Sequence, residues 1–145
     1  MKNPQTLAIE LNQMFSNKDL ESIAKWGCCA FTLLWCLGIE PEDIDAIKTL
    51  YDLKKEGAID EECTVYWGKA IKYLTGRTLE SLEKVKIKSI KNIKKRTPVR
   101  FVFNGLGHWV GVENGRIAFN SLQQSNCVEN GDPSEMRVLK IKGVN

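Results

Sequence analysis

Two side chains in the sequence could supply a nucleophile and its base: Cys28 and His108. Cys28 follows Gly27 at the predicted start of an apolar helix, where unpaired amides and the helix dipole favour a thiolate. His108 opens a predicted strand after a Gly-Leu-Gly segment at 105–107, whose glycines leave room for a substrate backbone. It is the only histidine in the chain, so any cysteine–histidine pair must use it. Considered singly, the cysteine also fits core packing, and the histidine fits a structural role.

A third polar residue, Asn120, depends for its position on a hairpin around the Asn-Gly pair 114–115. A two-residue loop would place His108 opposite Ser121 and turn Asn120 to the other face. A three-residue loop that includes Glu113 would place His108 opposite Asn120, with their Cβ atoms roughly 5 Å apart. The amide could then hold the imidazole in its working tautomer. We expect the three-residue loop, because glutamate suits its αR position and glycine its αL position.

Three short motifs resemble those of the papain-like cysteine peptidase superfamily. The run at 28–32, Cys-Cys-Ala-Phe-Thr, resembles the nucleophile helix of that superfamily. The run at 107–112, Gly-His-Trp-Val-Gly-Val, resembles its histidine strand, and Phe-Asn-Ser at 119–121 is similar to the segment that supplies the third residue. The order and spacing of the motifs are similar to those of small bacterial or prophage members, both bacteriocin-leader-processing and NlpC-like.

The resemblance implies a papain-like fold and a catalytic triad of Cys28, His108 and Asn120. It places the nucleophile at Cys28 rather than at Cys29, because Ala-Phe-Thr then matches the family run. It also implies an amide-cleaving reaction through an acyl-enzyme, with no cofactor and no metal. We therefore expect a cysteine peptidase or related thiol hydrolase that acts on a peptide or protein. Cell-wall peptides are one candidate class of substrate.

One position departs from the family pattern. A glutamine that helps to bind the oxyanion usually stands about six residues before the nucleophile, and Ser22 occupies that position here. The nearby amides Asn12, Gln13 and Asn17 do not have the required spacing. Since losing an oxyanion donor costs about a hundredfold or more in rate, two alternatives stay open. One is a catalytically inert papain-like binding module, and the other is an acyltransferase of transglutaminase type.

The predicted elements define an α+β chain of one domain, 1–145, with N-terminal helices and a C-terminal antiparallel β-sheet. A buried nucleophile helix should pack on that sheet, because its segment is apolar almost all round. Apolar periodicity and end signals predict helices at about 7–15, 27–37, 41–56 and 60–74, with a short basic helix at 89–95. Alternation predicts strands at 84–88, 99–103, 108–112, 116–120 and 136–141.

Composition excludes several other classes of protein. Five cysteines, an odd number with no C-x-x-C pair, favour neither a disulfide framework nor a zinc site. No stretch has the roughly 18 apolar residues of a membrane span, and no apolar signal core follows Met1. We therefore expect a cytoplasmic protein, and release by cell lysis stays open. The segment 84–100 carries eight Lys or Arg residues. It lacks aromatic residues that stack on bases, so we favour solvated faces over nucleic-acid binding.

Overall fold

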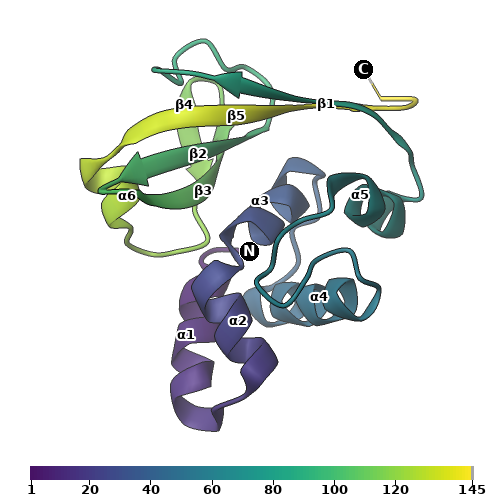
Figure 1. Cartoon of the computed structure of the whole chain (residues 1–145), viewed down its shortest axis with the longest axis vertical. Coiled ribbons are helices and arrows are strands. Elements are labelled where there is room, and N and C mark those ends of the chain that lie inside the picture. Colours follow the sequence, from purple (N-terminus) through teal and green to yellow (C-terminus); the bar gives the residue numbers. More distant parts are fainter. Residues whose placement is uncertain (145) are drawn as a thin grey trace.

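The computed structural model describes residues 1–144 and has the α+β architecture expected from the sequence (Figure 1). The helices of the first half are α1 (Pro4–Phe15), α2 (Lys18–Trp26), α3 (Cys28–Cys36), α4 (Asp43–Lys55) and α5 (Trp67–Thr75). The second half contains β1 (Leu79–Lys86), β2 (Thr97–Phe103), β3 (Leu106–Glu113), β4 (Arg116–Phe119), α6 (Asn126–Asn130) and β5 (Asp132–Ile141).

The described strands form one antiparallel sheet in the order β1-β5-β2-β3-β4. The last strand, β5, is therefore inserted between β1 and β2. In Figure 1 the sheet occupies one end of the molecule, and α1, α2 and α4 gather at the other. Helix α3 lies between these two parts, which places its first residues where the helical half and the sheet meet.

Helix α3 is fixed on strand β3 by one aromatic contact and one hydrogen bond. The Trp35 ring fills the space over Gly111, where any added Cβ would clash with it, and it stacks on Phe119 with ring centroids 6.1 Å apart. The Thr32 hydroxyl donates to the Trp109 carbonyl at 3.3 Å. These contacts hold the start of α3 at a fixed position along β3.

The sheet has a separate core on each face. Around α3, the helices pack into one cluster that includes Phe31, Leu33 and Leu34, none of which is exposed. On the opposite face, Val99 and Val110 belong to a second cluster that the segment before β2 and helix α6 help to cover. Alternation along β3 explains the division, because neighbouring residues point to opposite faces.

Helix α2 was not predicted, because its nine residues carry only a short apolar stripe. Its start is set by Asn17, whose side-chain oxygen accepts from the backbone N–H groups of Asp19 and Leu20 at 3.0 and 3.1 Å. It ends at Gly27, where a Cβ would lie 2.6 Å from the Ile23 carbonyl oxygen. Glycine therefore allows α2 to turn directly into α3. The short helix α6 was not predicted either.

The helix predicted at 60–74 is wrong in its first seven residues, because α5 begins only at Trp67. The Asp60 carboxylate accepts from the backbone N–H groups of Glu62 and Thr64, both at 2.9 Å. Such local side-chain bonds compete with a helix. Cys63 also has a φ of 56°, which is outside the helical region. The segment 60–64 is consequently a tight loop.

The short basic helix predicted at 89–95 is wrong as well. This segment forms turns, and Ile93 is buried in the second core. Its carbonyl accepts from the Gly115 N–H at 2.7 Å, and the Lys94 carbonyl accepts from the Asn114 N–H at 3.0 Å. The β3–β4 hairpin turn therefore donates hydrogen bonds to the Ile93 and Lys94 carbonyls, which a helix would have paired internally.

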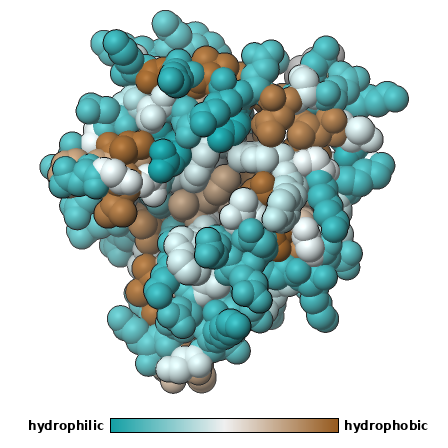
Figure 2. Space-filling model, in the orientation of Figure 1, coloured by the Kyte–Doolittle hydropathy of each residue, from teal (hydrophilic) through white to brown (hydrophobic). Residues whose placement is uncertain are grey.

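The surface and the cysteines have few special features within the described part of the chain. None of the helices in residues 1–144 combines the length and the apolar character needed to cross a membrane. All five cysteines are free, and no cluster of described His, Cys, Asp and Glu side chains could hold a metal ion. The face drawn in Figure 2 is mostly hydrophilic, with apolar residues in separate patches.

Candidate active site

The turn that positions Asn120 differs from the predicted one. Glu113 pairs directly with Arg116, so the loop contains only Asn114 and Gly115, with φ values of 52° and 74°. Two positive φ angles in a two-residue loop define a type I′ turn, which matches the twist of the flanking strands. The three-residue loop expected from the sequence is therefore wrong. Without a further irregularity, this turn would place Asn120 on the opposite face from His108.

A β-bulge in β4 restores the shared face. Val112 pairs with Ile117, but Gly111 pairs with Phe119, so Ala118 is an extra residue without a partner on β3. One extra residue reverses which side chains point to each face. Asn120 consequently lies on the same face of the sheet as His108. The cause is the bulge, which was not predicted from the sequence, and not the length of the loop.

His108 and Asn120 form the hydrogen bond that the predicted site required. The His108 Nε2 and Asn120 Oδ1 atoms are 2.7 Å apart. The same oxygen accepts from the Leu122 backbone N–H at 3.0 Å, so it acts as an acceptor and Nε2 must carry the proton. In the neutral ring, Nδ1 is then unprotonated and free to act as a base. The Asn120 amide therefore fixes the tautomer of His108.

Burial sets the protonation state of His108. The side chain is only 4% exposed, and this burial lowers the pKa below its ordinary value of 6.5. The hydrogen bond that His108 donates to Asn120 raises the pKa, but by less than burial lowers it. His108 is therefore neutral at pH 7.

Cys28 is the first residue of α3 and meets β3 at the residue after His108. The backbone N–H of Trp109 donates to the Cys28 sulfur, and the amides of Cys28 and Cys29 lie beside it. These donors lower the pKa of the thiol, but burial raises it by more. The expectation of a lowered Cys28 pKa is therefore wrong, because the helix start lies against the sheet and not in water. At neutral pH the sulfur is a thiol.

The neighbouring Cys29 is less suited to form a thiolate. Burial, followed by the charge of Cys28, raises its pKa well above the ordinary value, although the positive charge of Arg137 opposes this. It lacks the backbone donation from Trp109 that Cys28 receives. The surroundings of the two thiols therefore favour Cys28 as the more nucleophilic.

A cleft of about 330 Å³ opens over the two cysteines. One wall comes from the end of α2, the loop after Glu61 and the start of α5, and the other comes from β3 and β5. The lining residues are Lys25, Trp26, Cys28, Cys29, Glu62, Cys63, Thr64, Val65, Trp67, Gly107, Trp109 and Arg137. His108 is not among them. The cleft therefore gives a ligand direct access to the Cys28 sulfur.

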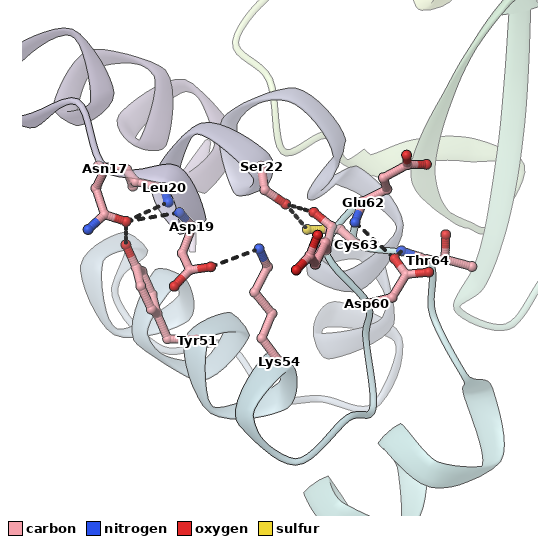
Figure 3. Close-up of polar contacts among 11 residues, drawn as sticks. Asn17, Asp19, Leu20, Ser22, Tyr51, Lys54, Asp60, Glu62, Cys63 and Thr64 are labelled. Atoms are coloured by element: carbon pink, nitrogen blue, oxygen red, sulfur yellow. Dashed lines mark hydrogen bonds and ion pairs between the residues drawn. The ribbon is translucent and has the colours of Figure 1, made fainter.

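A larger depression, of about 720 Å³, lies between α2 and α4, away from these residues. Two polar contacts cross it: Lys54 Nζ lies 3.5 Å from an Asp19 carboxylate oxygen, and the Tyr51 hydroxyl donates to Asn17 Oδ1 at 3.1 Å (Figure 3). It is lined by neither cysteine nor histidine. The smaller cleft over Cys28 is therefore the candidate active site.

Ser22, at the position where the family has its glutamine, points to the loop around Cys63. Its hydroxyl donates to the Glu61 carbonyl and lies 3.4 Å from the Cys63 sulfur (Figure 3). It thus fixes the loop that forms one wall of the cleft. Ser22 does not replace the missing oxyanion donor.

Gln5 connects the two halves of the site, a role that was not predicted from the sequence. This residue is 3% exposed, and its Nε2 donates to the Ala24 carbonyl at 2.9 Å. Its Oε1 accepts from the Ser121 hydroxyl at 2.7 Å. Ser121 follows Asn120, and Ala24 lies one helical turn before Cys28. No pattern around Gln5 pointed to this role, because its partners are distant in the sequence.

Gln5 also affects the amide at the start of α3. In an unbroken helix, the Ala24 carbonyl would accept the Cys28 N–H, four residues later. Here that carbonyl accepts from Gln5, and the Cys28 N–H lies beside the sulfur of its own side chain, where it lowers the pKa of the thiol. The Cys28 amide is therefore directed toward the candidate site.

Replacing Gln5 with leucine is expected to lower the free energy of unfolding by about 2 kcal/mol or more. The change leaves the buried Ser121 hydroxyl and the Ala24 carbonyl without their side-chain partner. Urea denaturation measures the effect. Gln13→Leu is the matched control, because Gln13 is exposed and its loss should change stability by less than about 0.5 kcal/mol. Equal effects of the two variants would contradict the role given to Gln5.

The structure links the three predicted site residues in two steps, and within residues 1–144 it shows no hydrogen bond between the Cys28 sulfur and the His108 ring. Asn120 is bonded to His108, and the strand residue after His108 is bonded to Cys28. Compared with protein-family models, curated proteins and solved structures, the chain gives no match. Function must therefore be inferred from the geometry and chemistry of the site itself.

Proposed function

We propose that the protein is a papain-like cysteine peptidase or related thiol hydrolase, with Cys28 as nucleophile, His108 as base and Asn120 as the residue that orients it. One observation carries the proposal: Asn120 Oδ1 lies 2.7 Å from His108 Nε2, and the next amide of the same strand donates to the Cys28 sulfur. The placement of Cys28 at the start of a helix that packs on an antiparallel sheet supports it.

The reaction begins with the neutral pair. As the Cys28 sulfur attacks an amide carbonyl, its proton passes to His108 Nδ1 and an S–C bond forms. His108 then gives this proton to the leaving amine as the C–N bond breaks, which leaves a thioester on Cys28. A water molecule, deprotonated by the same nitrogen, hydrolyses the thioester and restores the thiol. Asn120 stabilises the imidazolium and holds its orientation throughout.

The Cys28 backbone N–H is the donor best placed for the oxyanion. It stands at the first position of α3, where the positive end of the helix dipole favours negative charge. The loss of the usual glutamine is expected to make the reaction slower than in relatives that have one. This explains why activity should be measured with an activated ester before a peptide.

Acylation by p-nitrophenyl acetate tests the proposal. We expect one acetyl group on Cys28, detected by mass spectrometry of the intact protein and of its fragments. The rate should rise as His108 loses its proton, with a midpoint below pH 6.5, and stay constant through neutral pH because the pKa of His108 is lowered. His108→Ala should reduce the rate at pH 7 by about a hundredfold or more.

The outcome separates the proposal from its alternatives. Slow acetylation of every accessible cysteine, with no effect of His108→Ala, would identify an inert binding module and overturn the proposal. An acetyl-enzyme that hydrolyses in buffer supports a hydrolase. Acetyl transfer to an added primary amine, faster than hydrolysis, would instead indicate an acyltransferase.

A further inference from the structure

The sheet wall beside the cleft carries an unusual cluster of charges. The carboxylate of Glu135, on β5, is surrounded by three cations: Arg137 at 2.8 Å, Lys84 at 3.3 Å and Arg100 at 3.9 Å. Glu135 is 8% exposed. Burial raises its pKa, but hydrogen bonds from Arg137 and Lys84 outweigh this and keep the pKa below its ordinary value. The carboxylate is therefore charged at neutral pH, and the cluster carries a net charge of +2.

Stability alone does not explain this cluster. A partly buried ion pair adds little to folding stability, because the cost of removing both charges from water offsets most of their attraction. A second and a third cation around one carboxylate also repel each other. An excess of positive charge on the wall of a cleft does favour an anionic ligand.

Arg137 is the member of the cluster that faces the cleft. It lines the same cleft as Cys28 and Cys29, and its side chain is only 17% exposed. Its guanidinium carbon lies 5.0 Å from the centre of the Trp109 ring, and Trp109 packs edge-on against Trp67. The guanidinium is thus held between Glu135 and an aromatic wall. A guanidinium fixed in this way loses little conformational entropy when it binds a carboxylate.

The other charged groups of the cleft lie on the opposite wall and are of both signs. Lys25 is paired with Glu21 at 2.9 Å, and Glu62 is an exposed acid. Lys25, Glu21 and Glu62 together carry a net charge of −1, against +2 for the cluster around Glu135. The net field across the cysteines therefore comes from the side of Arg137.

We propose that Arg137 binds a carboxylate in the cleft beside Cys28, and that the substrate is therefore an acidic peptide. The anion site follows from the charge cluster alone. The assignment of its ligand as a peptide substrate rests on the proposed function. The carboxylate is that of an Asp or Glu side chain near the scissile bond or that of a free peptide C-terminus.

Alkylation of Cys28 tests the anion site without requiring hydrolysis. Iodoacetate is anionic and iodoacetamide is neutral, and both react with the same thiolate. The ratio of their rates therefore cancels any change in the pKa of Cys28. At about pH 8.5, Arg137→Gln is expected to lower the iodoacetate/iodoacetamide ratio at Cys28 about three- to tenfold. Fragment-ion mass spectrometry distinguishes Cys28 from Cys29.

The matched control is Arg116→Gln, which removes the same charge from an exposed position on β4 outside the cleft. It should leave the ratio unchanged. In the unaltered protein, the iodoacetate rate should also fall as salt rises from about 0.02 M to about 0.5 M, while the iodoacetamide rate stays constant. An equal ratio in the two variants, or an iodoacetate rate insensitive to salt, overturns the proposal.

Peptide pairs then identify the source of the carboxylate. We expect kcat/KM to be about three- to tenfold higher for an Asp or Glu peptide than for its Asn or Gln counterpart, or for a free C-terminus than for its amide. Equal values in both pairs would overturn the substrate assignment. If the alkylation ratio responds to Arg137 but no ester or peptide is cleaved, the anion site stands and the hydrolase proposal fails.

Discussion

Cys28→Ser is expected to lower the rate of ester and peptide cleavage by about a thousandfold or more. Serine preserves the size of the side chain, but its hydroxyl is a far weaker nucleophile beside a neutral imidazole. The Trp109 amide and the start of α3 remain in place, so folding should be unaffected. Steady-state kinetics with an activated ester measures the loss, and intact mass shows whether an acyl-enzyme still forms.

Cys29→Ser is the control for this prediction. Cys29 lines the same cleft and differs from Cys28 by one position on the same helix. We expect activity within about threefold of the unaltered protein, because a cleft side chain that does not react with the substrate contributes little to the activation free energy. If Cys29→Ser abolished activity while Cys28→Ser retained it, the nucleophile would be misassigned. Equal residual activity in both variants would exclude a cysteine nucleophile among these two.

Trp35→Ala is expected to lower the free energy of unfolding by about 3–5 kcal/mol. Trp35 is 4% exposed, and its ring fills the space over Gly111, stacks on Phe119 and contacts the Arg96 guanidinium. Removing the buried indole loses the free energy gained by transferring it from water to the core, and it leaves a cavity. Urea denaturation gives the value directly.

A double-mutant cycle shows whether this packing is specific to the α3–β3 contact. Gly111→Ala alone should destabilise by about 1–3 kcal/mol, because its Cβ clashes with the Trp35 ring. In the Trp35→Ala background only the tight contact with Phe119 Cβ, at 3.1 Å, remains, so the same change should cost less than about 1 kcal/mol and less than in the unaltered protein. Additive effects would mean that the indole does not set the distance between α3 and β3.

The same contact matters for the proposed chemistry. Trp35 and Thr32 on α3 bind Gly111 and Trp109 on β3, and these elements carry Cys28 and His108. A shift of the helix along the strand would separate the sulfur from the Trp109 amide. We therefore attribute the alignment of α3 and β3, which carry the proposed site, to this packing.

The sequence by itself determined the class of fold and the candidate residues. Helix and strand periodicities placed α1, α3, α4 and the strands β2 to β5 close to their observed positions, because burial on one side leaves a regular pattern. An Asn-Gly pair marked the hairpin. The single histidine left one choice of base, and the apolar run after Gly27 identified the central helix.

Only the tertiary structure decided how these residues meet. The predicted loop was one residue too long, and a bulge at Ala118 reversed the faces again, so that His108 and Asn120 are bonded. A bulge depends on how the whole sheet packs, and no local pattern signals it. The same holds for Gln5, whose partners are about 20 and 116 residues away, and for Arg137, whose role depends on charges from three strands.

The pKa of Cys28 illustrates the physical reason. A position at a helix start is encoded locally, and the sequence correctly indicated amides that favour a thiolate. Burial against β3 is a property of three-dimensional packing, and its desolvation raises the pKa by more than the amides lower it. Residue type and periodicity therefore fixed which groups could react, whereas packing determined their protonation, their neighbours and the cleft through which a ligand reaches them.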